Sequence, residues 1–522
     1  MNEARQSAGS ASDPARESVT WWLDLPGEAE TAALARHIAS FTGAGDLITL
    51  SGELGAGKTS FARAFIRHLT GQPELDVPSP TFTLMQVYEG KAVPIVHADL
   101  YRIKSPGELA ELGWDEAAVD ALVLVEWPDK AGDNLPPDRL DVALFTEPAQ
   151  GETWRRVRLT GFGAMGPRLA RAKGIDRLLV RTGWAGAERI FMLGDASTRA
   201  YERLRKSTGE SAVLMISPPR PDGPPVRYGK PYSAVARLAE DIRPFVAIAN
   251  ALRERGFSAP RIFGSDLVTG LAIIEDLGSE AIVDASGPIP GRYQEAVAAL
   301  AHLHAMPLPS SIPLGEDTYR IPPYDIDALL IEAELLTEWY APHLGVRLSS
   351  GAVATFINLW KSTLREIADG PKTWALRDYH SPNIIWLPQR EGLQRAGIID
   401  FQDCVIGSPA YDVASLLQDA RVTVPDELEL KLLSHYARQR RAADPAFDMG
   451  AFARAYAIMA AQRATKVLGI FARLNKRDRK PQYLAHVPRV RRYLAKSLTH
   501  PALADLKSWY EAHLPGVFEA GS

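Results

Sequence analysis

The chain has 522 residues, too long for one ordinary hydrophobic core, because single domains average roughly 150 residues. Hydrophobic residues make up 46% of it and charged residues 23%, a globular balance that excludes a fibrous or wholly disordered protein. The formal net charge of −4 provides no global positive field for nucleic acid and argues against autonomous RNA binding.

The single cysteine and the hydropathy pattern indicate the compartment. Cys404 alone cannot form an intrachain disulfide or a cysteine-rich zinc site, which favours a reducing cytoplasm. No run of about 18 apolar residues occurs, so we expect no membrane contact. Residues 1–20 are polar and lack the apolar segment of a signal peptide, and we interpret them as a disordered tail.

Residues 21–160 alternate short apolar runs with helical patterns. The apolar runs are DLITLS, PIVHAD, ALVLVE and RRVRL, at residues 46–51, 94–99, 121–126 and 155–159. A helical pattern starts at Lys58, directly after a glycine-containing loop. This alternation predicts an α/β domain.

The loop after the first apolar run fits the phosphate-binding consensus G-x-x-x-x-G-K-[ST]. Its residues are Gly52, Glu53, Leu54, Gly55, Ala56, Gly57, Lys58 and Thr59. The glycines let backbone N–H groups surround phosphate oxygens, Lys58 reaches the β- and γ-phosphates of ATP, and Thr59 is placed to bind Mg²⁺. An accidental glycine-rich turn is the alternative, and it is expected in roughly a few of every hundred chains of this length.

Two carboxylates end predicted strands of the same domain. Asp99 ends PIVHAD and Glu126 ends ALVLVE, so both are expected at the carboxyl edge of a parallel sheet, where α/β proteins bind ligands. There, one of them can hold Mg²⁺ or orient water. Alternatively, each acid caps a turn or pairs with Arg102 or Lys130, but their shared position at strand ends favours a functional role.

Four motifs in order resemble the TsaE family of bacterial ATPases. They are GELGAGKT, SPTFTL, HADLYRI and VEWP, which begin at residues 52, 79, 97 and 125. The resemblance implies an ATPase that supports threonylcarbamoyl modification of a tRNA adenosine, together with protein partners of that pathway. Contact with tRNA is then only indirect.

Residue roles follow from this resemblance. Lys58 and Thr59 bind phosphate and Mg²⁺, and Thr81 belongs to a switch-like loop. Asp99 assists the metal ion, and Glu126 is the hydrolytic carboxylate.

Residues 161–186 contain a glycine-rich break and a basic, helical stretch, which predicts a linker between two domains. The second domain, residues 187–522, opens with a sheet-rich part and becomes mostly helical from residue 292. In the first part we expect strands at 188–193, 212–217 and 271–278 and one helix at 232–256. The pattern predicts an α+β domain of two lobes.

Three polar residues in the second domain have the order and spacing of a phosphotransfer site. Asp378 and Asn383 form D-x-x-x-x-N, and Asp400 follows in IIDF after a predicted strand. Asp378 can accept the proton of a substrate hydroxyl, while Asn383 and Asp400 hold Mg²⁺. Alternatively, Asp378 and Asn383 form a turn around Ser381 and Pro382, and Asp400 caps the end of a strand.

The stretches LRDYHSPNIIW, IIDFQD, SPAYDVASLLQDAR and GDASTRAYERL resemble the aminoglycoside phosphotransferase-like kinases, in particular the AmgK-type sugar kinases of cell-wall recycling. The resemblance covers about residues 187–510. It implies a bilobal kinase-like fold that uses ATP and Mg²⁺ to phosphorylate the anomeric hydroxyl of an amino sugar, N-acetylmuramate or N-acetylglucosamine.

The same resemblance assigns further nucleotide-binding residues. They are Asp195, Ser197 and Thr198 in a loop over the ATP phosphates, and Glu275 and Leu277 in an adenine-contacting hinge. It also makes Asp412 the acid that braces the catalytic loop.

The second domain departs from the broader kinase pattern at two positions. Leu376 replaces the usual loop histidine, and Met215 stands where a phosphate-binding lysine is expected, so Arg199 or Arg203 is the candidate substitute. These departures leave open a catalytically inactive regulatory module. The shared loop chemistry also leaves open a kinase for choline, a homoserine-like alcohol or an aminoglycoside.

Residues 461–497 hold eleven Lys or Arg and the single acid Asp478. This basic segment fits an interaction with tRNA, an anionic sugar or an acidic partner, and equally a solvated helical face.

Overall fold

The computed structural model describes residues 18–104, 108, 119–192, 199–219 and 223–518. The chain divides into two compact units, Met1–Arg177 and Leu178–Ser522. The division falls within helix α5 (Met165–Arg181), inside the predicted linker. Over the described ranges, no helix is both long and apolar enough to cross a membrane.

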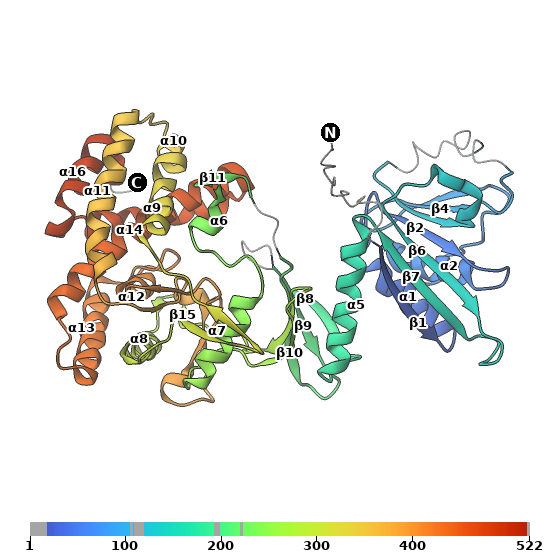
Figure 1. The fold of residues 1–522 in the computed structure, drawn as a ribbon, viewed down its shortest axis with the longest axis horizontal. Coiled ribbons are helices and arrows are strands. Elements are labelled where there is room, and N and C mark those ends of the chain that lie inside the picture. The colour runs from blue at the N-terminus through green and yellow to red at the C-terminus, as the bar shows by residue number, and fades with distance from the viewer. Residues whose placement is uncertain (1–17, 105–107, 109–118, 193–198, 220–222, 519–522) are drawn as a thin grey trace, which may run out of the picture. The chain divides into compact units, whose positions relative to one another are not determined.

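Within the described residues, the first unit combines strands with most of α5 and with helices that precede and follow the glycine-rich loop. Its elements are β1 (Ser18–Leu25), α1 (Glu28–Ala39), β2 (Leu47–Ser51), α2 (Lys58–Thr70), β3 (Met85–Tyr88), β4 (Ile95–Asp99), β5 (Leu122–Glu126), β6 (Arg139–Thr146) and β7 (Arg155–Phe162). In the described residues these strands form one seven-stranded sheet in the order β1-β7-β6-β2-β5-β4-β3 (Figure 1).

The centre of this sheet is parallel and its edges are antiparallel. β2 pairs in parallel with β5 and β6, and β4 with β5, whereas β1, β3 and β7 run antiparallel to their neighbours. Apolar side chains of α1 and α2, including Phe61 and Phe65, join the largest core of the unit. The parallel register sets Asp99 beside Glu126, so the two carboxylates emerge at one edge of the sheet, as predicted.

The second unit begins with an antiparallel sheet. Its strands, in the order β13-β14-β10-β9-β8, are β8 (Glu188–Met192), β9 (Ala200–Arg205), β10 (Ser211–Ile216), β13 (Ile262–Asp266) and β14 (Leu271–Glu275). The segment between β10 and β13 contains β11 (Pro225–Arg227), β12 (Lys230–Pro231), α6 (Tyr232–Val235) and α7 (Arg243–Glu254). Buried residues of α7 join the core that underlies β10 and β14.

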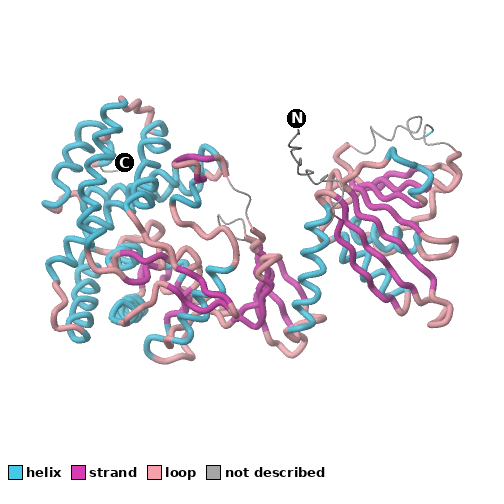
Figure 2. Tube along the Cα trace, viewed as in Figure 1, coloured by secondary structure: helices cyan, strands magenta, loops and turns pink. Residues whose placement is uncertain are grey.

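The rest of the second unit is mostly helical (Figure 2). Its helices are α8 (Pro290–Ala305), α9 (Ile326–Leu335), α10 (Ala341–His343), α11 (Ser350–Asp369), α12 (Ala410–Leu417), α13 (Asp426–Ala443), α14 (Met449–Asp478), α15 (Val487–Ser497) and α16 (Ala504–His513). Its short strands are β15 (Val283–Asp284), β16 (Gly287–Pro288), β17 (Ser311–Leu314), β18 (Asp317–Arg320), β19 (Thr373–Ala375), β20 (Ile384–Trp386), β21 (Ala396–Ile398) and β22 (Val405–Gly407).

The α/β and α+β classes predicted for the two halves are confirmed, but some boundaries differ. β1 starts at Ser18, within the predicted tail. The single helix predicted over 232–256 is wrong: the structure has two helices, α6 and α7, separated by an irregular segment. In that segment Arg237 adopts a left-handed φ of 59°, which interrupts a right-handed helix.

Candidate active sites

The loop between β2 and α2 forms a cradle of backbone groups. Gly52, Gly55 and Gly57 have φ angles of 143°, 81° and 103°, a region that favours glycine. A Cβ atom on Gly52 would lie 2.5 Å from the carbonyl oxygen of Leu144, so this position requires glycine. Helix α2 starts at Lys58, so its N-terminal N–H groups lie next to the cradle, where an anion is stabilised.

The ammonium group of Lys58 lies within this loop. Its Nζ donates to the carbonyl oxygens of Gly52 and Glu53, at 2.8 and 2.9 Å. The ring centroid of Trp127 is 3.8 Å from Nζ, a cation–π contact. Burial lowers the pKa of Lys58 from its ordinary value, while the charge of Glu126 opposes that shift. The cation is therefore held by neutral acceptors, which are weaker than a phosphate oxygen.

Glu126 connects the loop with two neighbouring elements. Thr59 Oγ1 donates to its Oε2 at 3.1 Å, and His97 Nε2 lies 3.0 Å from its Oε1. Glu126 and His97 are both buried. His97 is two residues before Asp99 and therefore lies on the same face of β4, a spacing that could have identified it as a site residue from the sequence.

The Asp99 carboxylate is held from both sides. Its Oδ2 accepts a hydrogen bond from the Ser79 hydroxyl, and its Oδ1 accepts one from the backbone N–H of Tyr101 at 2.9 Å. A cleft of about 390 Å³ opens beside it, a volume typical of ligand sites. It is lined by Leu54, Gly55, Gly57, Lys58, Thr59, Ser60, Ser79, Thr81, Asp99, Tyr101, Arg102, Glu126 and Trp127. The structure thus brings Thr81, Asp99 and Glu126 to the predicted phosphate cradle.

Arg155 of β7 supports the cradle through its guanidinium group, a role not predicted from the sequence. Its Nε donates to the carbonyl oxygen of Ala56 at 2.8 Å, and its Nη2 to that of Gly55 at 3.2 Å. These bonds satisfy two carbonyl oxygens of the loop and help to fix its backbone. About a hundred residues separate the partners, so no local sequence signal identifies them.

In the second unit, the three residues of the predicted phosphotransfer site meet. Asn383 Nδ2 donates to the carbonyl oxygen of Asp378 at 2.9 Å and lies 3.4 Å from Oδ2 of Asp400. Asp400 follows β21 and has a φ of 58°, a left-handed conformation unusual for aspartate. Gln402 Nε2 donates to Asp400 Oδ1 at 2.8 Å.

The two aspartates of this site differ in their electrostatic surroundings. Burial alone raises the pKa of the Asp378 carboxyl, but nearby charges, including His380, Lys466 and Arg377, outweigh burial and hold the pKa below its usual range. Burial, and next the charge of Asp378, raise the pKa of Asp400. Opposite pKa shifts in two neighbouring carboxyl groups are typical of sites where the two groups have different chemical roles.

Two further carboxylates hold the loop that carries Asp378. Asp412 accepts hydrogen bonds from the backbone N–H groups of Leu376 and Arg377, at 2.6 and 2.9 Å, in the bracing position predicted for it. Burial raises the pKa of Asp412 to about 7. Asp419 accepts from the backbone N–H of Ser381 at 2.9 Å and also from its hydroxyl. Asp419 lies in the motif SPAYDVASLLQDAR, but its sequence position alone does not indicate this role.

The two candidate phosphate cations have different partners. Arg199 Nη1 lies 3.1 Å from Oδ1 of Asp400, within the three-residue site. Arg203 pairs instead with Asp276, at 2.8 Å. Met215 is fully buried in the core below the sheet. Of the two arginines, the geometry therefore places only Arg199 at the predicted metal-binding acid.

The predicted adenine hinge follows β14. The Glu275 carboxylate accepts from Arg390 at 2.5 Å and from Arg253 at 3.2 Å, so its side chain is engaged in ion pairs. Leu277 is partly buried. Asp195, Ser197 and Thr198, predicted to lie over the ATP phosphates, are outside the described residues.

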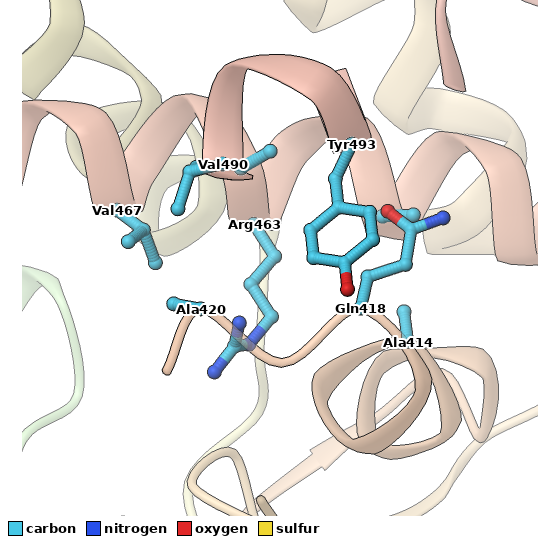
Figure 3. A pocket seen from close by; sticks show the side chains of 9 residues that line it. Ala414, Gln418, Ala420, Arg463, Val467, Val490 and Tyr493 are labelled. Carbon is cyan, nitrogen blue, oxygen red and sulfur yellow. The ribbon is translucent and has the colours of Figure 1, made fainter. Parts of the chain in front are cut away.

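A small cavity of about 10 Å³ lies between α14, α15 and the end of α12 (Figure 3). Arg463, Gln418 and Tyr493 are its polar lining residues. Its volume accommodates about one water molecule, so neither a sugar nor a nucleotide fits.

Comparison with known proteins separates the two halves of the chain. The family model described as threonylcarbamoyl adenosine biosynthesis protein TsaE matches residues 25–156. The model described as phosphotransferase enzyme family matches residues 190–446.

Individual relatives agree with these models. The N-acetylmuramate/N-acetylglucosamine kinase of Caulobacter vibrioides is 36% identical over 349 residues, covering 65% of this chain and 95% of the relative. The kinase of the same name from Pseudomonas aeruginosa is 32% identical over 343 residues, covering 64% of this chain and 91% of the relative. The tRNA threonylcarbamoyladenosine biosynthesis protein TsaE of Rickettsia felis is 43% identical over 122 residues, covering 23% of this chain and 71% of the relative.

Proposed function

The chain belongs to the TsaE family in its N-terminal part and to the N-acetylmuramate/N-acetylglucosamine kinase family in its C-terminal part, and from this premise we propose a bifunctional ATP-using enzyme. One activity hydrolyses ATP in support of threonylcarbamoyl modification of a tRNA adenosine. The other phosphorylates the anomeric hydroxyl of N-acetylmuramate or N-acetylglucosamine for cell-wall recycling. The kinase proposal is carried by the 36% identity to a kinase of that name, which the chain covers almost completely.

In the proposed kinase reaction, Asp378 is the general base. It accepts the proton of the anomeric hydroxyl as the sugar oxygen forms a bond to the γ-phosphorus of ATP. The bond between that phosphorus and the β–γ bridging oxygen breaks, and ADP leaves with its electron pair. The lowered pKa of Asp378 supports this role, because a base must be ionised before it accepts a proton.

The residues present fit Mg²⁺ at both sites. Mg²⁺ prefers oxygen ligands, which Asn383 and Asp400 offer in the kinase site and Thr59 and Asp99 in the ATPase site. In the described part of the chain, no cluster of three or more His, Cys, Asp or Glu could enclose a metal ion. Mg²⁺ in nucleotide-dependent enzymes is commonly bound by one or two carboxylates together with the phosphates of ATP. When bound, Mg²⁺ neutralises charge on the phosphates.

In the proposed ATPase reaction, Glu126 orients the attacking water. Its contacts to His97 and Thr59 support this role, because they fix the carboxylate beside the phosphate cradle. Lys58 neutralises the phosphates, and Thr81 responds to the nucleotide as part of a switch-like loop. The activity is expected to depend on protein partners of the threonylcarbamoylation pathway, with tRNA bound through them, in the cytoplasm.

We assign the ATPase to residues 21–160 and the kinase to residues 187–522, with 161–186 as the linker. In the kinase, Arg199 supplies the phosphate-binding cation that Met215 cannot, supported by its contact with Asp400. The other proposed ATP contacts are the loop of Asp195, Ser197 and Thr198 and the hinge of Glu275 and Leu277.

The decisive experiment combines both activities in one panel. ATP-dependent phosphorylation of N-acetylmuramate and N-acetylglucosamine is measured with the wild-type chain and with Asp378→Ala and Lys58→Ala. Loss of sugar phosphate in Asp378→Ala alone supports the kinase. If the wild type phosphorylates neither sugar but retains Lys58-dependent ATP hydrolysis, the second unit acts on another alcohol, such as choline or an aminoglycoside, or is a regulatory module.

A further inference from the structure

Lys466 of α14 belongs to the basic segment 461–497, yet it points into the protein. Its Nζ lies 2.8 Å from Oε1 of Glu332 and donates to the Tyr411 hydroxyl at 3.3 Å. The side chain is only 12% exposed. A buried ammonium group is retained only where it is paired, so the role of Lys466 lies in these contacts.

Glu332 of α9 is the centre of a buried ion cluster. Its side chain is 1% exposed and is contacted by the guanidinium of Arg377, the ammonium of Lys466 and the hydroxyl of Tyr324. Two cations therefore share one carboxylate. Asp378 interacts electrostatically with both cations, which connects the cluster to the proposed general base.

Arg377 connects Glu332 with the loop that carries Asp378. It directly precedes Asp378 and has a φ of 69°, a left-handed conformation that a side chain disfavours and that persists where the surroundings enforce it. Its guanidinium pairs with Glu332, and its Nη1 also donates to the carbonyl oxygen of Ala236 at 2.9 Å. Because the Arg377 side chain is held by these contacts, they also hold the left-handed backbone at Arg377, which sets the position of Asp378.

Lys466 reaches the same loop by a second route. Tyr411, whose hydroxyl accepts from Lys466, is followed by Asp412. Asp412 binds the backbone N–H groups of Leu376 and Arg377. Lys466 is thus connected to the Arg377 side chain through Glu332, and to the Arg377 backbone through Tyr411 and Asp412.

We infer that Lys466, together with Glu332, is a positioning residue of the kinase site, which sets the geometry of the loop that carries Asp378. The inference rests on the proposed kinase function. A positioning role predicts a loss of kcat without a loss of substrate binding, because Lys466 acts on the loop through Glu332 and Tyr411 and does not contact the reacting atoms.

The test uses the full-length variants Lys466→Met, Lys466→Arg and Glu332→Gln, with initial rates measured over ranges of ATP and N-acetylmuramate. For Lys466→Met we expect kcat to fall about tenfold to a hundredfold, while both KM values stay within about twofold of wild type. Lys466→Arg keeps the charge and is expected to restore most of the lost kcat. A raised KM at unchanged kcat, or equal kcat values for the Met and Arg variants, would overturn the inference.

Lys476→Met is the matched control, because Lys476 is an exposed residue of the same helix, and it should keep wild-type kinetics. If Lys466→Met does not fold, Glu332→Gln decides, since it preserves the side-chain shape: a lower kcat at constant KM supports the inference, and a wild-type kcat overturns it. A wild-type chain that phosphorylates no sugar contradicts the proposed function itself, a result distinct from any behaviour of the variants.

Discussion

The guanidinium of Arg199 lies 3.1 Å from the carboxylate of Asp400, although 201 residues separate the two in the chain. Arg199 precedes β9 of the sheet, whereas Asp400 follows β21 in the mostly helical part. The pair therefore places a cation at the acid proposed to hold Mg²⁺. At the position where kinases of this type usually have a lysine, this domain has the buried Met215.

Replacement of Arg199 by Met should mainly impair the use of ATP. Without the cation we expect kcat/KM for ATP to fall roughly a hundredfold, as when one charge-stabilising donor is lost. Arg199→Lys should be intermediate, because lysine keeps the charge but not the planar fork. Sugar-kinase rates at varied ATP measure the effect. Arg203→Met is the control, and an unchanged kcat/KM in Arg199→Met would exclude the phosphate role.

Glu126→Gln should abolish ATP hydrolysis by the first domain while ATP still binds. Removing the carboxylate is expected to lower the hydrolysis rate about a hundredfold to ten-thousandfold, the range for a general base. Phosphate release, measured in an Asp378→Ala background to silence the kinase, gives the rate, and a fluorescent ATP analogue reports binding. Lys58→Met, the comparison variant, should lose binding as well. Hydrolysis at the original rate would reassign the catalytic carboxylate.

Two glycines of the phosphate cradle should differ in their tolerance of alanine. Gly52→Ala forces a Cβ to 2.5 Å from a backbone carbonyl of β6, whereas Gly55→Ala meets nothing within 4 Å and is strained only by its positive φ. We expect Gly55→Ala to cost about 1–2 kcal/mol of stability and Gly52→Ala clearly more, with loss of ATP binding. Urea unfolding of the first unit tests the ranking, and equal costs would contradict the steric argument.

His304 should contribute to acid sensitivity of the second domain. Burial lowers its pKa from the ordinary 6.5 to about 3, and its Nδ1 lies 2.8 Å from the Tyr436 hydroxyl. Between these two pH values the unfolded chain binds a proton that the folded chain does not. The stabilising contribution is therefore complete above pH 6.5 and declines toward pH 3, by about 1.4 kcal/mol per pH unit.

His304→Gln should remove this part of the pH dependence. The wild type is expected to lose about 2 kcal/mol more than the variant when the pH falls from 6.5 to 4.5. Calorimetric unfolding at the two pH values measures the difference. Equal losses in both proteins would show that His304 is not the responsible group.

Local sequence patterns were sufficient to predict the phosphate-binding loop and the acidic residues at the strand ends of the first domain. The motif from Gly52 to Thr59 requires particular residues at fixed spacing, so its shape follows from a few adjacent positions. Asp99 and Glu126 were predictable together because parallel strands end at a common edge. The helix predicted over 232–256 failed because apolar periodicity does not reveal a left-handed residue such as Arg237.

The chain order of Asp378, Asn383 and Asp400 and the family resemblance were readable in the sequence alone, since both depend on the identity and spacing of residues. The contacts that hold these residues in place could not be predicted from the sequence. Lys466, Glu332 and Arg377 meet only after three distant segments pack together, and so do Arg155 and the carbonyl groups of the P-loop. A basic segment such as 461–497 looks the same in sequence whether its cations face water or a buried carboxylate. Only tertiary packing decides between the two, because the energy of a charge depends on its burial and its partners.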